Sequence, residues 1–598
     1  MPIRTAIAGL GTYSPERSIS IRERERTPFG IRLPIGRVTG IESVRIAAGD
    51  EFAIDLARKA AQDCLSRADV SAAEVGLLIS CGICRYDLPD YGHVFEPSTA
   101  ARLSRQLGLT QALSFDVSNA CAGMFTGIYL ADAFLRAGRC RYALVASGEF
   151  ISHMAETALA EIQGLFDPRM ACLTLGDGGA AVLLTLTEQD CGFEAMSLYS
   201  KPEHSQLCTA RPSKRCHGGA IMYTDSAGIA DKMLGELEHH VPRFLAAQGS
   251  PAVNWLVPHQ TSLKSVKEGC RRFKRSLGER AFDSEQLLLS LGHRGNTAST
   301  SHMLALRDGL SSGKVQDGDR VLFSVNASCL VVGSFLYRTG TPKPEDRSMA
   351  IDTMRARICG IGIIESHPCS PHMPTFSDAV TKALEEAQST REDVDLMIFA
   401  GVYRDNFIME PSVAALLAKQ CGIACGQGEG FLCFDLFAGE NGLLYALEVS
   451  EALLATGKYK TAMILCGDTD PNVACSFAPP LGILQTAAAL IVRAGGEAAT
   501  PASVLRFETD LVRHTRQRQG ETFVLETGVP ASGEAMHAAL DQSISYCNAA
   551  ALNFIRLTRS GTAMTGNLVR TLLGASGVGL LAGATRFGEA VGKVIEVA

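Results

Sequence analysis

An internal repeat is the feature of this sequence that most constrains its fold. Residues 409–415 (Met-Glu-Pro-Ser-Val-Ala-Ala) repeat residues 95–101 (Phe-Glu-Pro-Ser-Thr-Ala-Ala), and residues 434–442 repeat residues 115–123. A repeat of this extent indicates that a whole domain was duplicated within one chain. We therefore expect two units of related fold.

Length and a linker divide the chain in the same way. Its 598 residues exceed what one hydrophobic core usually serves. The stretch over residues 341–349 is polar and contains prolines, which is typical of a linker. We predict a first domain over residues 1–340, called the first copy, and a second over residues 350–598, called the second copy.

Apolar strands alternate with amphipathic helices in the first copy. We expect strands at 75–80, 142–147, 254–257 and 320–325, and helices at 52–65, 98–107, 227–248, 262–277 and 300–313. Such alternation is typical of a layered α/β fold.

Composition excludes several classes of protein. Hydrophobic residues at 46% and charged residues at 20% indicate a globular chain. The net charge of −7 argues against nucleic-acid binding. No apolar run approaches the ~20 residues that cross a bilayer, and the N-terminus lacks the apolar segment of a signal peptide. We expect a cytoplasmic protein that does not bind membranes.

The nineteen cysteines are expected to be reduced thiols, because their number is odd and no secretion signal precedes them. Cys81 and Cys84 have the spacing of a zinc or redox half-site. No second pair follows at metal-site spacing, so we predict buried thiols here and no metal site.

Cys121 lies where a strand is expected to end and a helix to begin. Met124, Ile128, Ala131 and Leu135 recur at helical spacing, which predicts a largely buried helix that ends at Gly138. Free N–H groups and the positive end of the helix dipole favour a thiolate at such a junction. Cys121 is therefore a candidate nucleophile, although a buried thiol that fills a gap is the alternative.

Two motifs downstream favour the interpretation of Cys121 as a nucleophile. Pro258-His259-Gln260 follows a short apolar strand, and Gly295-Asn296-Thr297 comes later. With Cys121 in its Ala-Cys-Ala-Gly turn, they resemble the β-ketoacyl-acyl carrier protein synthase III branch of the thiolase superfamily. Gly176–Ala181 is similar to the family's strand-edge signature. The resemblance covers residues 1 to roughly 340, and three spaced motifs rarely coincide by chance.

The resemblance implies a fold and a set of roles. The fold is the thiolase-like five-layer αβαβα arrangement, here duplicated with an abbreviated second copy. Cys121 would carry the acyl group, while His259 and Asn296 would donate N–H groups to a second thioester and stabilise its enolate. From the residues alone, His259 also suits a helix cap and Asn296 a turn.

The resemblance also implies the reaction and the partners. We expect an acyltransferase or condensing enzyme that takes acyl thioesters of coenzyme A or acyl carrier protein, needs no other cofactor, and passes the acyl group to a malonyl- or β-ketoacyl-carrier-type acceptor. Acyl transfer to an alcohol or amine and a tetronate-type C–C/C–O ring closure are alternatives. A non-catalytic carrier-binding partner is the alternative from another class.

One loop departs from the family pattern. The family has a glycine-rich loop near its C-terminus, whereas this chain has Ala327, Ser328 and Cys329 there. We predict that this oxyanion and pocket loop shapes a different site, which favours specialised, polyketide-like metabolism over fatty-acid initiation. Cys329 also invites comparison with degradative thiolases, although their glycines are missing.

Glu96 is a possible accessory base. In relatives that condense two acyl thioesters without decarboxylation, a glutamate on the corresponding loop has this role. Glu410 repeats the motif in the second copy, and an acidic residue before a helix that starts with proline explains both glutamates equally well.

A basic cluster follows the His259 motif on one expected helix and includes Lys267, Arg271, Arg272 and Lys274. A solvated helix face is the simpler interpretation. In this family, however, the helix is where carrier proteins dock, and a basic patch suits an acidic carrier.

The second copy is expected to be degenerate. The repeat aligns Glu440 with Cys121, and no second Pro-His-Gln is present. We predict a structural role for this copy, with Glu440 as a carboxylate catalyst the alternative. The family dimerises beside the cysteine helix, so the chain is expected to form an intrachain pseudo-dimer or a homodimer.

Overall fold

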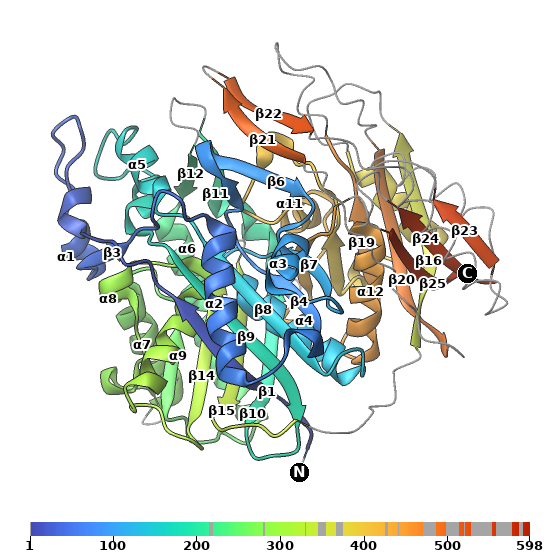
Figure 1. Ribbon diagram of the computed structural model, residues 1–598, viewed down its shortest axis with the longest axis horizontal. Coiled ribbons are helices and arrows are strands. Elements are labelled where there is room, and N and C mark those ends of the chain that lie inside the picture. Colours follow the sequence, from blue (N-terminus) through green and yellow to red (C-terminus); the bar gives the residue numbers. More distant parts are fainter. Residues whose placement is uncertain are drawn as a thin grey trace.

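The computed structural model describes residues 2–213, 219–278, 281–328, 330–344, 354–365, 375–424, 428–439, 442–469 and 486–497, and the strands 513–518, 521–527, 553–557, 577–584 and 590–597. Among these residues the largest element is a 13-stranded sheet that crosses both copies (Figure 1). In order across the sheet, its strands are β1 (Arg4–Tyr13), β9 (Gly178–Thr187), β8 (Tyr142–Glu149), β4 (Val75–Ser80), β7 (Leu113–Ser118), β18 (Leu432–Phe437), β17 (Leu396–Phe399), β19 (Ala462–Cys466), β20 (Thr486–Glu497), β16 (Met354–Glu365), β25 (Ala590–Val597), β24 (Gly577–Ala584) and β23 (Asn553–Leu557).

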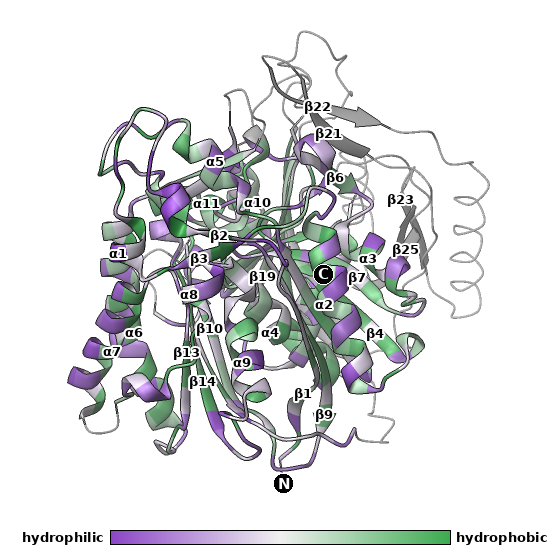
Figure 2. Ribbon diagram, turned by 60° about the vertical axis from the view of Figure 1, so that its left-hand side comes forward, coloured by the Kyte–Doolittle hydropathy of each residue, from purple (hydrophilic) through white to green (hydrophobic). Residues whose placement is uncertain are grey.

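The first copy has five layers. Helices α2 (Ala53–Ala68) and α3 (Thr99–Leu107) pack against the large sheet. Helices α4 (Gly123–Arg136) and α9 (Ser301–Ser311) lie between this sheet and a second one, formed by β10 (Gly192–Ser200), β15 (Val331–Arg338), β14 (Arg320–Ala327) and β13 (Trp255–Pro258). Helices α6 (Ser226–Ala247) and α7 (Leu263–Leu277) form the outer layer (Figure 2). The predicted helices are present, with ends that differ by at most three residues.

The central helix α4 is buried along almost its whole length, as its apolar sequence predicts. Phe125 on α4 packs against Phe323 and Phe335 of the second sheet, with ring centroids 5.3 and 4.7 Å away. The helix therefore holds its first residues, and Cys121 just before them, at a fixed place between the two sheets.

Helix α2 approaches the large sheet closely because glycines face it. A Cβ added at Gly11 or Gly148 would lie 2.2 Å from the Ala60 oxygen or 1.9 Å from the Ala53 oxygen. A glycine also allows close helix–sheet contact in the second copy, where a Cβ at Gly362 would lie 1.8 Å from the Ala379 oxygen of α10 (Ser377–Glu386). No larger residue fits at these contacts.

The described part of the second copy repeats the order of the first. The elements β1, α2, β4, α3, β7, α4, β8 and β9 correspond to β16, α10, β17, α11 (Val413–Gln420), β18, α12 (Gly442–Ala455), β19 and β20. The strands also have the same order across the sheet. The order in the first copy is β1-β9-β8-β4-β7, and the corresponding order in the second copy is β16-β20-β19-β17-β18. The described part of the second copy therefore has the element order of the first half of the first copy, which agrees in part with the predicted duplication of a whole domain.

The two copies meet through equivalent elements. Strands β7 and β18 pair antiparallel, with Val117 opposite Leu436 at the centre of the pairing. Figure 1 shows α4 next to α12, its counterpart. Across this contact, Arg139 forms ion pairs with the buried carboxylates of Glu448 and Glu451, the latter at 3.0 Å.

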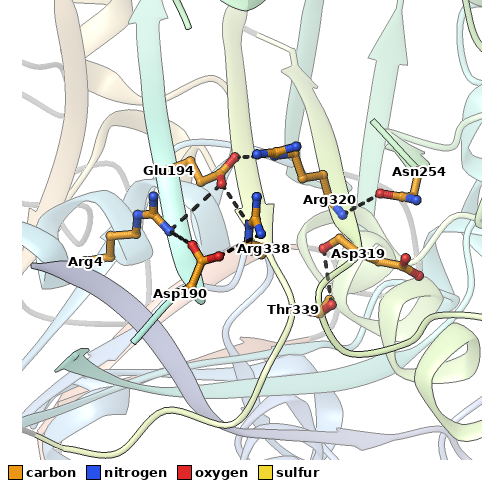
Figure 3. Close-up of polar contacts among 8 residues, drawn as sticks. All are labelled: Arg4, Asp190, Glu194, Asn254, Asp319, Arg320, Arg338 and Thr339. Carbon is orange, nitrogen blue, oxygen red and sulfur yellow. Dashed lines mark hydrogen bonds and ion pairs between the residues drawn. The ribbon is translucent and has the colours of Figure 1, made fainter. Parts of the chain in front are cut away.

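An ion-pair network ties the first strand to the second sheet (Figure 3). The Glu194 carboxylate on β10 lies 2.8 Å from Arg320 and 3.1 Å from Arg338, and the Arg4 guanidinium on β1 lies 3.9 Å away. Asp190 also binds Arg4, at 3.1 Å. The network joins β1 of the large sheet to β10, β14 and β15 of the second sheet.

The thirteen cysteines that the structure describes are all free thiols. Cys81 and Cys84 are buried directly after β4. Within the described ranges, no cluster of three or more metal-ligating side chains occurs, and none of the helices is both long and apolar enough to cross a membrane.

Candidate active site

Cys121, His259 and Asn296 lie far apart in the sequence, but the structure places all three on one cavity of about 1080 Å³. Cys121 comes from the turn between β7 and α4, His259 follows β13, and Asn296 precedes α9. Hence the five layers bring together the three residues that the sequence motifs single out.

The Cys121 turn is built by its own backbone. Ala120 adopts φ +51°, and the Ala122 and Gly123 N–H groups donate to the carbonyls of Asn119 and Ala120 at 3.1 and 3.0 Å. These bonds start α4 directly after Cys121. The side chain is partly buried and lines the cavity.

The expectation of a thiolate at Cys121 is wrong for these surroundings. Burial raises the pKa of the Cys121 thiol well above its usual value, and the carboxylates of Glu410 and Glu149 raise it further. The position before a helix does not outweigh these effects. Cys121 therefore holds its proton at neutral pH.

His259 is neutral. Its backbone N–H donates to the Ser324 carbonyl at 3.0 Å, and its ring stacks on His302 with centroids 5.8 Å apart. Burial, with a smaller effect of His302, lowers the pKa of His259 to about 3. Its Nδ1 atom has no hydrogen-bond partner among the described residues. A neutral imidazole can donate one N–H group without adding charge to the cavity.

Asn296 is oriented by its own loop. Its backbone N–H donates to the Thr174 carbonyl at 2.8 Å, and its Oδ1 atom accepts from the Ala298 N–H at 3.0 Å. This leaves the side-chain NH₂ group as the donor for the cavity. The glycine signature explains the fit of the loop, since a Cβ at Gly176 would lie 1.9 Å from the Arg294 oxygen.

The predicted pocket loop is only partly at the cavity. Ser328 lines it, whereas Ala327 is fully buried at the end of β14, and Cys329 lies outside the described residues. Ser324 and Asn326 also line the cavity, and sequence reasoning missed both. Their alternation with buried Val325 along β14 is the signal that could have found them.

The structure places Glu410, and not Glu96, on the Cys121 cavity. Glu96 ends β6 (Gly92–Glu96), where its carboxylate accepts a hydrogen bond from the Tyr403 hydroxyl of the second copy. It also faces Gly439, on the turn that corresponds to the Cys121 turn. The prediction of Glu96 as an accessory base for Cys121 therefore fails, because each glutamate reaches into the other copy. Glu440 lies outside the described residues.

Helix α7 forms part of the cavity wall and carries the predicted basic cluster. Lys267, Arg271 and Lys274 are exposed. Glu268 binds Arg271 at 2.7 Å and Arg272 at 3.2 Å, so these two charges are partly balanced within the helix.

The rest of the cavity is mainly apolar. Its lining includes Ile151, Met154, Met222, Met233 and Phe273. Three more lining side chains are exposed to solvent: Val38 at 52%, Leu165 at 53% and Phe166 at 99%. The cavity thus joins the polar side chains of Cys121, His259 and Asn296 to an apolar region that reaches the surface.

Comparisons of the sequence with known proteins identify the family that the three motifs resemble. Residues 115–202 match the family model of 3-oxoacyl-[acyl-carrier-protein] synthase III, and residues 247–339 match that of its C-terminal part. β-Ketoacyl-[acyl-carrier-protein] synthase III of Rhodospirillum centenum is 32% identical over 346 residues, which cover 56% of this chain and 100% of the relative. The chain belongs to the β-ketoacyl-acyl carrier protein synthase III family.

Other relatives align with a similar share of this chain. Synthase III of Pectobacterium atrosepticum is 30% identical over 338 residues, which cover 56% of this chain and 99% of the relative. Among solved structures, synthase III from Aquifex aeolicus aligns with 25% identity and a TM-score of 0.47, covering 56% of this chain and 100% of the relative. OleA from Xanthomonas campestris aligns with 26% identity and a TM-score of 0.49, covering 56% and 97%. Membership of the synthase III family makes this chain an acyltransferase with a thiolase-like fold.

Proposed function

We propose that this synthase III homologue loads an acyl group onto Cys121 and condenses it with a second, carrier-bound thioester. The observation that carries the proposal is the placement of Cys121, His259 and Asn296 on one cavity with a largely apolar lining. The apolar region supports an acyl chain as the first substrate, because burial of methylene groups is favourable.

The geometry supports a two-step reaction. The Cys121 sulfur attacks the acyl thioester and releases the donor thiol, which leaves an acyl-enzyme. The N–H groups of His259 and Asn296 then bind the carbonyl oxygen of a malonyl-type thioester, where negative charge develops as CO₂ leaves. The enolate carbon attacks the carbonyl of the acyl-enzyme, the bond between that carbonyl and the Cys121 sulfur breaks, and the Cys121 thiolate takes up a proton from solvent as the β-ketoacyl product leaves.

Acylation of Cys121 tests the proposal. After incubation with a panel of acyl-coenzyme A and acyl-carrier thioesters, intact-protein mass spectrometry should show an acyl mass shift that is absent from Cys121→Ala. Loss of labelled CO₂ from a malonyl donor distinguishes condensation from acyl transfer to an alcohol or amine. No acyl-enzyme with any donor would favour a non-catalytic carrier-binding partner.

We further propose that the outer face of α7 binds the acidic surface of an acyl carrier protein. Helix α7 forms part of the cavity wall and is exposed, which supports docking beside the acyl site. The departure of the loop over Ala327 and Ser328 from the family pattern supports a specialised, polyketide-like pathway.

Charge reversal on α7 should separate carrier-bound from free substrates. Lys267→Glu with Lys274→Glu is expected to lower kcat/KM for acyl-carrier donors about 10-fold or more at low salt, and to change the value for the matching acyl-coenzyme A by less than about twofold. Arg271→Glu and Arg272→Glu are less specific tests of docking, because each substitution also breaks an ion pair with Glu268. Equal losses for the two donors would refute carrier docking here.

We also infer that the second copy is a degenerate domain that takes the place of a partner subunit, so that one chain forms a pseudo-dimer. The pairing of β7 with β18 supports this, since it is centred on equivalent residues as in a two-fold interface. Asp116 and Asp435 are equivalent and act alike: each accepts from two N–H groups at the start of the preceding helix, α3 or α11.

A further inference from the structure

We propose that His302 is a positioning residue, which holds the His259 imidazole where its N–H and that of Asn296 reach the same carbonyl oxygen. The inference rests on the proposed function, in which these two side chains stabilise the enolate of the second thioester. It assigns a task in condensation to a buried histidine that does not itself line the cavity.

His302 links the two donors through its place in the chain. It lies in the first turn of α9, six residues after Asn296, and the segment between them is held by its own hydrogen bonds. Its ring stacks on the His259 ring, with an angle of 17° between the planes and centroids 5.8 Å apart. Contact between the two rings therefore sets where His259 lies relative to Asn296.

The Ser324 carbonyl on β14 binds both histidines. It accepts the His259 backbone N–H at 3.0 Å, and it lies 3.2 Å from His302 Nε2. A carbonyl oxygen can only accept hydrogen bonds, so Nε2 of His302 carries the proton and donates it to this bond. The residue after β13, the strand β14 and the start of α9 are thereby tied together at one oxygen atom.

Aromatic side chains hold the His302 ring on other sides. Phe125 on α4 meets it edge to face, with centroids 5.0 Å apart, and the Phe323 ring on β14 lies 6.5 Å away. Both phenylalanines are fully buried, in the central helix and in the second sheet. The His302 ring is therefore fixed by the core and offers the His259 ring a fixed surface on which to stack.

Packing alone does not explain a histidine at this position. His302 Nδ1 is buried and has no hydrogen-bond partner among the described residues, a cost that an apolar side chain would avoid. Burial lowers the pKa of His302 to about 4, and burial with a smaller effect of His302 lowers that of His259 to about 3. Each ring is therefore neutral at pH 7 and keeps one N–H group, that of His302 for the Ser324 carbonyl and that of His259 for the cavity.

Separate measurement of acylation and condensation tests this role. In His302→Leu, condensation on a preformed acyl-enzyme should fall about 10–10²-fold because the His259 N–H is misplaced, whereas acylation of Cys121 should change by less than about twofold. His302→Gln, whose side-chain NH₂ group can still donate to the Ser324 carbonyl, should condense at least about fivefold faster than His302→Leu.

Three results of these rate measurements would overturn the inference. They are wild-type condensation in His302→Leu, equal losses in both steps, and a His302→Gln variant that is no faster than His302→Leu. Circular dichroism should show that each variant is folded. If His302→Leu does not fold, His302→Gln alone decides, since its condensation should still fall more than its acylation.

His153 provides a matched control within the same copy. It begins α5 (His153–Leu159), is also buried, and its ring packs on that of Tyr91 with centroids 5.0 Å apart. Like His302, it does not line the cavity. His153→Leu makes the same chemical change away from His259 and should leave both steps at wild-type rates. A loss of condensation as large as that of His302→Leu would overturn the inference.

Crystal structures of the substrate-free variants test the positioning without any activity. The His259 ring should have one orientation in the wild type and in His153→Leu, and it should be rotated or occupy several orientations in His302→Leu. An unchanged His259 ring in His302→Leu refutes the role of His302. Failure of the wild type to condense any pair of thioesters refutes the proposed function itself, and the orientation of the ring still decides whether His302 positions His259.

Discussion

Replacing His259 by alanine is expected to lower condensation about 10²–10³-fold while acylation of Cys121 continues, since the imidazole N–H serves the second step. Asn296→Ala should have a similar effect. The double variant should lose much less than the product of the two, because both donors bind the same oxygen. Single-turnover acylation and release of CO₂ from a malonyl thioester measure the two steps separately.

The pH dependence of the condensation rate gives a second test of the role of His259. Because the pKa of His259 is about 3, its ring stays neutral down to pH values far below the ordinary value of about 6.5. Condensation on a preformed acyl-enzyme should therefore show no loss between pH 8 and 5 that depends on His259. His293, which is 75% exposed, provides the control, and His293→Ala should leave both steps unchanged. Loss of acylation in His259→Ala would place this residue in the first step instead.

Replacing Arg139 by alanine should be the most destabilising change at the contact between the copies. The substitution leaves Glu448 and Glu451 buried without their cation, and removal of one partner from a buried ion pair costs about 3–5 kcal/mol of unfolding free energy. The Glu451 carboxylate also accepts from the Ala356 N–H at 2.5 Å, which holds it in place when the arginine is gone.

Arg67 on α2, far from the contact between the copies, is the control. Its side chain is 45% exposed and pairs at 2.8 Å with Asp63, whose side chain is 30% exposed, so Arg67→Ala should cost less than about 1 kcal/mol. Urea unfolding can be followed by the fluorescence of Trp255, the one tryptophan of the chain. If the two variants unfold at the same urea concentration, the contact between the copies contributes no special stability.

Much of the fold could be predicted because it depends on local patterns. The alternation of apolar strands and helices placed the elements of the first copy within a few residues. The repeat predicted a second unit, and the described strands follow the same order across the sheet. The three motifs around Cys121, His259 and Asn296 also singled out these residues, because together they resemble the motifs of the synthase III family.

The surroundings of those residues could not be predicted in this way. A cysteine before a helix was expected to be a thiolate, but burial and two carboxylates that are distant in sequence raise the pKa of its thiol. Likewise, the basic cluster on α7 looked like four similar charges, until Glu268 proved to bind Arg271 and Arg272.

The layered fold and the repeat were thus readable from the amino-acid sequence, because they follow from periodicity and from repeated segments, and the three motif residues were readable through the family resemblance. Which glutamate faces Cys121 depended on the packing of the two copies. Glu96 and Glu410 lie in near-identical segments, so no local signal distinguishes them. The antiparallel pairing of β7 with β18 turns the copies toward each other, and each copy then places its glutamate at the other's turn.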